Sequence, residues 1–414
     1  MSAILRIDDF ADDFNPFTAL LTVGGEGHID DPYPELARLR KIAPVHAIDL
    51  QSHLGAPRHV TIGDRPTYTV LGWDEVTHVL STPAEFSNRV YESNLGITFG
   101  KTITALDPPL HTKYRKLIMA AFTPNVLDRY RSMFQAVIDR LIEKFINRGQ
   151  ADLVQDFALH FPFQFIMDLM NMDVKQRPIF HKMAIAQMCV TFDRARGVQA
   201  SAILGKFLEQ LVDQRRALHS EEDFVSVIAN AEVDGERLPQ EIVVSFFRQL
   251  MNAGGDTSFH GFSNQVTALL THPEQLAMIR RDRGQIPAAI EEALRWNGPL
   301  CAINRTTTRD LVLGGVEIPK DAYLHVCIGA ANRDEKLWPN PNVFDITRPR
   351  QRQMAFGYGP HVCIGQHLAR MELTMAMNTL LDRLPNLRLD PDMPPPAIRG
   401  VTLRGAEHVQ VVFG

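Results

Sequence analysis

The sequence predicts a mainly α-helical fold with a minor β region, and three observations support this prediction. Apolar residues recur at helical spacing over long stretches, above all from 109 to 219. Strand-like alternation is confined to short segments near 67–71 and 305–328. No Ser/Gly-rich or Pro-rich linker divides the interior of the 414 residues. We therefore expect a single domain, 1–414, although length alone would allow two or three units of about 150 residues.

The first quarter of the chain combines short regular elements with one irregular segment. Residues 34–43 and 73–80 have the apolar spacing of short helices, and TYTVL at 67–71 is typical of a strand. Residues 87–104 follow no regular period. Because an irregular segment of that length in a compact chain is usually functional, we expect it to help form a ligand site.

The rest of the chain is predominantly helical. EVDGERL at 232–238 carries Asp-Gly, a strong hairpin signal. Pro239 can open a helix and Pro273 blocks its continuation, so a long helix is expected over 239–272. The remaining expected elements are a helix at 286–296, strands within 305–328, a proline-rich irregular stretch at 329–362 and a last helix at about 364–384.

Composition argues against several classes of protein. The net charge of −5 gives no overall cationic field, so we expect no binding of nucleic acid. No run of about 18 apolar residues occurs, so no membrane span is predicted. The first residues are too acidic and too interrupted for a signal peptide, so a cytoplasmic protein is expected. The four cysteines form no C-x-x-C pair, which disfavours a zinc site, and we expect reduced thiols.

The segment FGYGPHVCIGQHLAR, residues 356–370, is the most informative part of the sequence. Gly357 and Gly359 permit tight turns. Cys363 follows, just before a predicted helix, where unpaired amide groups and the positive end of the helix favour a thiolate. Gly365 leaves room for a flat cofactor to lie against the backbone. A thiolate held in this way is a good ligand for haem iron. The alternative interpretation is a buried structural cysteine on a glycine-rich loop.

This loop resembles the cysteine loop of the cytochrome P-450 family. The family pattern F-x-x-G-x-[HR]-x-C-x-G is matched by Phe356, Gly359, His361, Cys363 and Gly365. Three further motifs follow the family order, so that the resemblance extends over nearly the whole chain. It implies a triangular helical fold that encloses haem b, with Cys363 as the axial iron ligand and Phe356 and Gly365 beside the cofactor.

The second motif is AGGDT, residues 253–257, in the middle of the predicted long helix. Two adjacent glycines weaken a helix and can let it bend or let a flat ligand approach. Close packing of two helices is an equally good explanation of the glycines. In the resembled family this site lies over the distal haem face. By resemblance, Thr257 and Asp256 are the catalytic residues that deliver protons during oxygen activation, which suits a hydroxyl and a carboxyl group.

The third motif places Glu292 and Arg295 three residues apart, on one face of a helix. On a surface such a pair would contribute only about 0–1 kcal/mol. In the resembled family the two charges belong to a buried structural network with a later arginine, here Arg348. We assign these three residues to folding and to the integrity of the haem pocket.

The fourth motif, DPPLHTKYRK at 107–116, carries His111 and Arg115 on one face of a predicted helix. An ordinary polar helix face is the alternative. The resemblance assigns both residues to the haem propionates, together with Arg305 and His361. Guanidinium groups suit this role because they bind carboxylates through two parallel hydrogen bonds.

The function that the resemblance implies is a monooxygenase, which inserts one atom of O2 into a small hydrophobic substrate. The electrons would come from NAD(P)H through a separate ferredoxin or flavodoxin and its reductase. The basic residues Lys113, Lys116, Arg350 and Arg352 are a candidate docking patch for such a partner. A peroxide-driven haem oxygenase and a non-catalytic haem sensor are the alternatives, and the presence of Asp256 and Thr257 argues against both.

The pocket for the substrate is the least determined part of the site. Counting back from Thr257, Asn252 and Gln249 fall on a similar side of the long helix. One hypothesis is that at least one of these amides binds a polar group on a mainly hydrocarbon substrate. The other is that both bond to neighbouring helices within the core. The candidate apolar walls are Ile97, Phe99, Ile303 and Val401.

Overall fold

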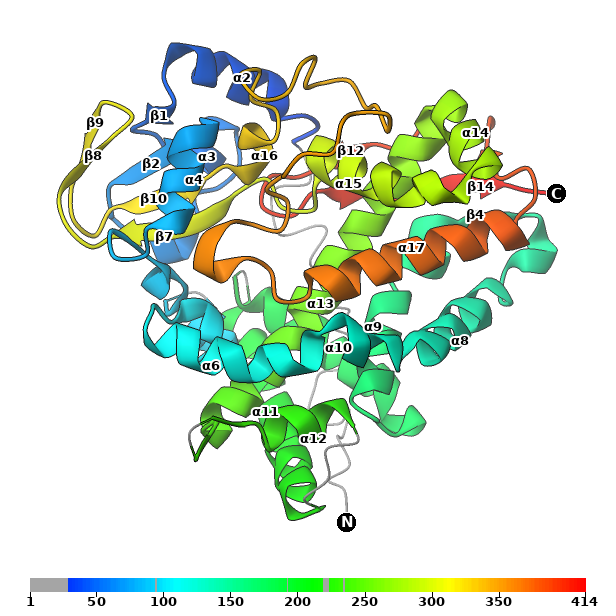
Figure 1. Ribbon diagram of the computed structural model, residues 1–414, viewed down its shortest axis with the longest axis horizontal. Helices are drawn as coiled ribbons and strands as arrows, with labels where there is room; N and C mark the ends of the chain where they lie inside the picture. The colour runs from blue at the N-terminus through cyan, green and yellow to red at the C-terminus, as the bar shows by residue number, and fades with distance from the viewer. Residues whose placement is uncertain (1–28, 94, 192, 219–222, 234) are drawn as a thin grey trace.

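The computed structural model describes residues 29–93, 95–191, 193–218, 223–233 and 235–414. Its central element is the long helix α13 (Gln240–Thr271), which runs through the middle of the molecule (Figure 1). Nearly every side of α13 is buried, as expected of a helix that carries apolar residues around its circumference. It packs against α9 (Phe161–Leu169), α11 (Arg194–Leu218), α15 (Ile286–Asn297) and α17 (Gln366–Arg383).

The other helices surround this centre. They are α2 (Tyr33–Ile42), α3 (Leu50–His53), α4 (Trp73–Ser81), α5 (Leu95–Phe99), α6 (Leu110–Met119), α7 (Pro124–Asp128), α8 (Arg131–Ile142), α10 (Arg177–Met188), α12 (Phe224–Ala229), α14 (Pro273–Arg281) and α16 (Ile328–Ala331).

A five-stranded sheet lies at one side of the molecule, away from most of the helices (Figure 1). Its strands lie in the order β1-β2-β10-β7-β3, and β2 and β10 form its parallel pair. The bounds are β1 (Val45–His46), β2 (Thr67–Val70), β3 (Phe86–Ser87), β7 (Ile303–Thr307) and β10 (Tyr323–Val326). The smaller sheets comprise β4 (Gln150–Asp152), β5 (Glu232–Val233), β6 (Glu236–Arg237), β8 (Leu311–Leu313), β9 (Val316–Ile318), β11 (Arg388–Leu389), β12 (Ile398–Arg399), β13 (Gly405–Ala406) and β14 (Gln410–Val412).

The fold is mainly α with a minor β region, as the sequence predicts. The expected long helix, the 232–238 hairpin and the last helix are confirmed within two residues at each end. The prediction for 87–104 was wrong in part, because this segment contains α5 and two short 3-10 turns. The 109–219 region is also not continuously helical, since β4 and a π-helical turn at Leu153–Ala158 interrupt it.

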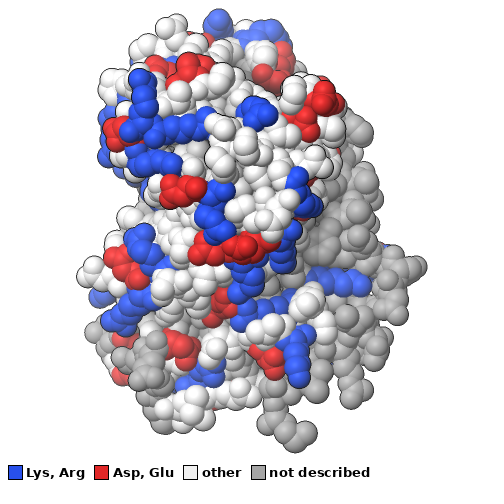
Figure 2. Space-filling view, turned by 90° about the vertical axis from the view of Figure 1, so that its right-hand side faces the viewer, with Lys and Arg blue, Asp and Glu red and all other residues white. Residues whose placement is uncertain are grey.

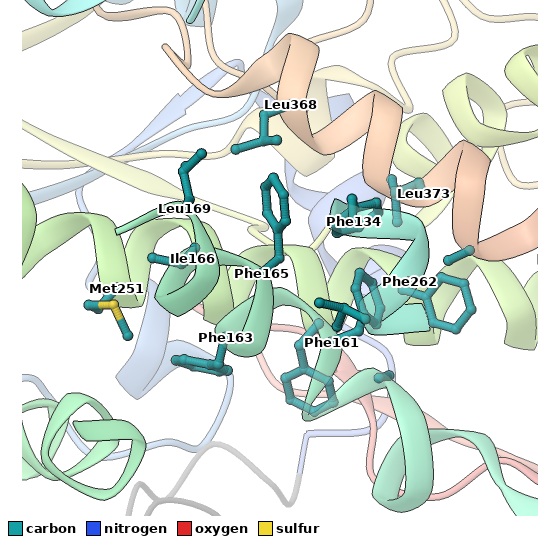
Figure 3. Packing of buried hydrophobic residues seen from close by; sticks show 14 of the residues in the cluster. Phe134, Phe161, Phe163, Phe165, Ile166, Leu169, Met251, Phe262, Leu368 and Leu373 are labelled. Atoms are coloured by element: carbon teal, nitrogen blue, oxygen red, sulfur yellow. The ribbon is translucent and has the colours of Figure 1, made fainter. Parts of the chain in front are cut away.

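The main apolar core lies between α13 and the helices α8, α9 and α17 (Figure 3). Aromatic side chains fill much of it. The rings of Phe134 and Phe165 meet edge to face with their centroids 4.4 Å apart, and Phe161 packs against Phe262 of α13 at 5.4 Å. Such pairs add about 0.5–1.5 kcal/mol each beyond the area they bury. This packing fixes the position of α13 relative to its neighbouring helices.

Positive and negative side chains are interspersed on the outer face shown in Figure 2. This face therefore carries charges of both signs. Among the helices that the structure describes, none is long and apolar enough to cross a membrane.

Candidate functional site

The cysteine loop is a tight backbone turn that ends at the start of α17. The Gly357 N–H donates to the Met354 carbonyl, and the Cys363 N–H donates to the Phe356 carbonyl, both at 2.8 Å. Gly357 and Gly359 have φ values of +73° and +71°, a region that residues with a side chain rarely adopt. A Cβ on Gly359 would also collide with the Leu80 carbonyl oxygen of α4. The two glycines are therefore required by the path of the loop.

Cys363 lies at the point where hydrogen-bond donors and positive charge converge. Burial raises the pKa of its thiol, while the N–H of Gly365 and the guanidinium groups of Arg115 and Arg370 lower it. The effect of burial is the larger, so a thiolate at this position needs a further positive charge, such as a metal ion. Cys363 is exposed, whereas the other three cysteines, Cys189, Cys301 and Cys327, are buried.

Two imidazoles and two guanidinium groups cluster beside this loop. His111 of α6 and His361 of the loop have ring centroids 3.8 Å apart, and burial lowers the pKa of both, that of His111 to about 4. His111 Nδ1 and His361 Nε2 are buried without a hydrogen-bond partner. Arg115 donates to the Val362 carbonyl, and the buried Arg305 of β7 donates to the Asn304 carbonyl at 2.7 Å.

This cluster has the donor set that carboxylates require. The unpartnered ring nitrogens of His111 and His361 lie next to two cations, and unpaired buried polar atoms cost about 1–3 kcal/mol each. An anion that accepted hydrogen bonds from them would remove this cost and raise both pKa values. The four residues assigned to the haem propionates, His111, Arg115, Arg305 and His361, thus fit two carboxylate groups.

The AGGDT segment of α13 presents two different faces. Ala253 is exposed although it lies in the middle of a buried helix, and Thr257, one turn further on, donates from Oγ1 to the Ala253 carbonyl at 2.6 Å. The glycines face the other way. A Cβ on Gly254 would lie 2.8 Å from Ile166 Cδ1, and one on Gly255 would lie 2.5 Å from the Phe163 ring. Both neighbours belong to α9, which crosses α13 there (Figure 3). Close helix packing therefore explains the glycines.

Asp256 and Thr257 are adjacent in sequence, but their side chains have different surroundings. Asp256 is 6% exposed, and burial raises its pKa, which the nearby His260 opposes. Its Oδ1 lies 3.7 Å from His260 Nδ1, and that nitrogen contacts the Asp256 carbonyl at 2.8 Å. Within the part of the chain that the structure describes, no hydrogen bond joins the carboxyl group to the Thr257 hydroxyl. A proton that passes between them needs a bridging molecule.

Glu292, Arg295 and Arg348 form one buried network. Arg295, which is 1% exposed, makes two parallel hydrogen bonds of 2.7 Å to the Glu292 carboxylate. Arg348 adds a bond of 3.0 Å to Glu292 Oε1, and the two arginines also bind the carbonyl groups of Val343 and Pro341. The network therefore connects α15 to residues 341–348, which belong to the irregular segment before the cysteine loop.

The residues expected around the substrate differ in their hydrogen bonding and in their burial. The Gln249 amide accepts a hydrogen bond from the Thr104 hydroxyl at 3.1 Å and donates one back to it at 2.9 Å. Both amide atoms of Asn252 are buried without a partner. Val401 and Phe99 are buried at 0% and 3% exposure, whereas Ile97 and Ile303 are only half-buried. The last two are thus better placed to touch a ligand.

Sequence reasoning missed Arg370, which lies on α17. Its guanidinium group sits 4.4 Å above the Phe356 ring, lowers the pKa of Cys363 and binds Glu291. It belongs to the same segment, FGYGPHVCIGQHLAR, so a basic residue this close to Cys363 in the chain could have indicated it. Tyr91 was also missed. Its hydroxyl accepts a hydrogen bond from the Asn304 N–H at 2.9 Å and is also hydrogen-bonded to the Arg305 side chain. No local sequence pattern identifies Tyr91 as part of the site.

A cysteine just before a helix, one N–H and two guanidinium groups that favour its thiolate, and a cluster suited to carboxylates beside it fit a haem-thiolate site. The comparisons with known proteins agree with this class. The family model for cytochrome P450 matches residues 35–184 and 163–408. The chain belongs to the cytochrome P450 family, whose members bind protohaem (haem b) and act as monooxygenases.

Several relatives resemble this chain over nearly its whole length. Cytochrome P450 monooxygenase PikC of Streptomyces venezuelae is 32% identical over 391 residues, which is 91% of each chain. 6-Deoxyerythronolide B hydroxylase of Saccharopolyspora erythraea is 31% identical and covers 92% of this chain and 96% of its own. The ligand-free structure of cytochrome P450 TbtJ1 superposes with a TM-score of 0.82 at 29% identity, over 92% of this chain and 97% of that one.

Proposed function

We propose that this protein hydroxylates a small hydrophobic substrate in the cytoplasm, with O2 and with electrons from NAD(P)H. The overall reaction consumes substrate, O2, NAD(P)H and a proton, and it yields alcohol, water and NAD(P)+. The observation that carries the proposal is the cysteine loop, where the Gly365 N–H, Arg115 and Arg370 all favour the thiolate of Cys363. When bound, haem b supplies the redox-active iron that activates oxygen.

The protein's own residues have separate tasks in this proposal. Cys363 would ligate the iron, and His111, Arg115, Arg305 and His361 would bind the propionates. Thr257 holds a hydroxyl group at the exposed face of α13, where it can pass a proton. Asp256, whose raised pKa makes it a better proton donor near neutral pH, would feed Thr257 through a bridging water molecule.

The electron donor in this proposal is a ferredoxin or flavodoxin with its reductase. Of the four basic residues expected to form its docking patch, Lys116, Arg350 and Arg352 are exposed. Lys113 is half-buried and paired with Glu236. We expect the rate of reduction by the partner to fall as ionic strength rises, because electrostatic steering is screened by salt.

A spectrum of the reduced protein with carbon monoxide tests the proposal at its centre. We expect the red-shifted absorption band of thiolate ligation in the wild type and its loss in Cys363→His. An identical spectrum in the variant would show that Cys363 is not the ligand.

Turnover with NAD(P)H and redox partners, compared with turnover on hydrogen peroxide alone, separates the monooxygenase from the peroxide-driven alternative. Haem binding with no turnover under either condition would favour a sensor.

A further inference from the structure

A histidine of α13 lies beside the Asp256 carboxyl group. His260 follows Asp256 by one helical turn, and its Nδ1 lies 3.7 Å from Asp256 Oδ1. Among the residues that the structure describes, no other Lys, Arg or His comes within 4 Å of this carboxyl group. The same Nδ1 lies 2.8 Å from the Asp256 carbonyl oxygen, which can only accept a hydrogen bond. Nδ1 therefore carries a proton, and Nε2 is the nitrogen that gains or loses one.

The helix places His260 between the two residues proposed to deliver protons. At about 100° per residue, its side chain points about 40° away from the direction of Asp256 and about 60° away from that of Thr257. His260 is half-buried. Its Nε2 forms no hydrogen bond within the described part of the chain, and this atom is not buried. The outer nitrogen of the ring is therefore free to exchange a proton with water.

The position of the imidazole ring is fixed by packing as well as by its hydrogen bond. Gly405 of β13 makes room for the ring, since a Cβ there would collide with His260 Cδ2 and lie 3.2 Å from Cγ. The ring of Phe259 packs near it, with the centroids 4.3 Å apart. The Ser263 hydroxyl donates to the His260 carbonyl at 2.9 Å. The ring is thus held between the backbone of β13 and its own helix.

The other charged groups near this part of α13 have different partners or lie on another side. Arg404 and Glu407 flank β13. The Arg404 guanidinium group donates to oxygen atoms of other segments, and within the described residues Glu407 forms no ion pair with His260. Glu372 of α17 is buried and bonds to the Ser258 side chain, which points about 160° away from His260 around the helix. A charge on His260 therefore acts mainly on Asp256.

We propose that His260 is a positioning residue for Asp256, and that a proton taken up by its imidazole drives the carboxyl proton of Asp256 toward Thr257. The inference rests on the proposed function and adds a residue to its proton path. Burial otherwise keeps the proton on Asp256, because burial raises the pKa of this carboxyl group. A positive charge 3.7 Å away favours the carboxylate and so promotes release of that proton.

The protons balance in this scheme. One proton enters from water at His260 Nε2, and the carboxyl group of Asp256 releases one through a bridging water molecule to Thr257. The pair is reset when the proton of the imidazolium passes to the carboxylate. Each cycle thus moves one proton inward and leaves both groups as they began.

Infrared spectroscopy of the haem-loaded protein measures the coupling without turnover and without an organic substrate. The carboxylic C=O band of Asp256 is identified by its absence from Asp256→Asn. The pH midpoint of this band is then compared between the wild type and His260→Gln, whose side chain is polar but takes up no proton. We expect the midpoint to rise by about 0.5 pH units or more, because the carboxylate loses a positive neighbour. His260→Asn serves as a second variant with the same expected direction.

His272, which follows the last residue of α13, provides a matched control. Its Nδ1 contacts the Ala268 carbonyl at 2.7 Å, four residues earlier, as His260 contacts the Asp256 carbonyl. The residue at that position carries no carboxyl group. His272→Gln should therefore leave the midpoint of the Asp256 band unchanged.

Oxygen consumption with NAD(P)H, a ferredoxin and its reductase gives a second measurement that needs no organic substrate. Protons must reach the oxygen whether peroxide or water is formed. We expect His260→Gln to lower the rate about threefold or more, with haem content unchanged. In Asp256→Asn, adding His260→Gln should change the rate less than about twofold, because His260 acts through Asp256. His272→Gln should consume oxygen as the wild type does.

Two results would overturn the assignment. One is an unchanged midpoint of the Asp256 band in both His260→Gln and His260→Asn. The other is an equal loss of rate when His260→Gln is made in the wild type and in Asp256→Asn, which would indicate a structural role. Either result in a protein that shows the thiolate spectrum refutes the inference and leaves the proposed function standing. Absence of the thiolate spectrum would refute the proposed function itself.

Discussion

At the scale of single residues, Thr257 is positioned to act on protons and not to hold the cofactor. Its hydroxyl bonds to its own helix at the Ala253 carbonyl, so its removal breaks no contact between elements. We expect Thr257→Ala to bind haem and substrate as the wild type does. Product formed per NAD(P)H should fall at least several-fold, with the missing electrons recovered as hydrogen peroxide. Thr257→Ser, which keeps the hydroxyl, should restore coupling.

The coupling experiment has a clear contrary result. Unchanged product yield per NAD(P)H in Thr257→Ala would show that the hydroxyl takes no part in proton delivery. Asp256→Asn should instead slow turnover with less loss of coupling, because its carboxyl group lies beside His260 and away from Thr257.

Arg295 and Arg348 both form ion pairs with Glu292 but differ in exposure, so their substitutions can be compared directly. Arg295 is fully buried, so Arg295→Ala leaves Glu292 without its two short bonds. We expect a loss of about 3–5 kcal/mol in the free energy of unfolding, together with low haem content. Arg348→Ala should cost less, because the side chain is 12% exposed and water can replace part of its bonding. Urea denaturation measures both, and equal losses would contradict this ranking.

At the scale of elements, the contact of α9 with α13 depends on Gly255. A Cβ there would press into the Phe163 ring, whereas a Cβ on Gly261 of the same helix would meet only Leu294 Cδ2 at 3.9 Å. We expect Gly255→Ala to destabilise the protein by about 1–3 kcal/mol through overpacking. Gly261→Ala should stabilise it by up to about 1 kcal/mol, since alanine favours a helix. Thermal unfolding of the two variants tests the difference, and a destabilising Gly261→Ala would argue against it.

The elements also show which features of the protein can be predicted from its sequence. The long helix was predictable because Pro239 and Pro273 mark its ends. The cysteine loop was predictable because its glycines lie close to Cys363 in the chain. The helix α5 was missed because it is only five residues long, too short for a periodic signal. The orientation of Asn252 depends on tertiary packing, and the pairing of Gln249 with Thr104 joins distant segments. Neither leaves a local pattern.

At the scale of the whole molecule, a buried histidine links stability to pH. Burial lowers the pKa of His181 to about 3 from its ordinary value of 6.5, and its ring packs against that of Phe163 with the centroids 4.4 Å apart. The unfolded chain therefore binds more protons below pH 6.5, so stability is lost as pH falls from 6.5 toward 3. At pH 5 this histidine should cost about 2 kcal/mol relative to neutral pH. We expect His181→Phe to remove that part of the loss.

Urea denaturation at pH 7 and pH 5 measures this linkage in both proteins. The stability difference between the two pH values should be smaller in His181→Phe than in the wild type. An unchanged difference would mean that His181 keeps an ordinary affinity for protons in the folded state.

The parallel pairing of β2 with β10 has a consequence for how the protein forms during synthesis. Thr67 lies opposite Tyr323, so the first strands of the chain cannot complete their sheet until most of the polypeptide has left the ribosome. Pairings between such distant segments are slow to form, because the intervening loop must close first. Until then, β2 presents an unpaired edge that invites association with other chains. The nascent protein should consequently depend on chaperones until β10 has emerged.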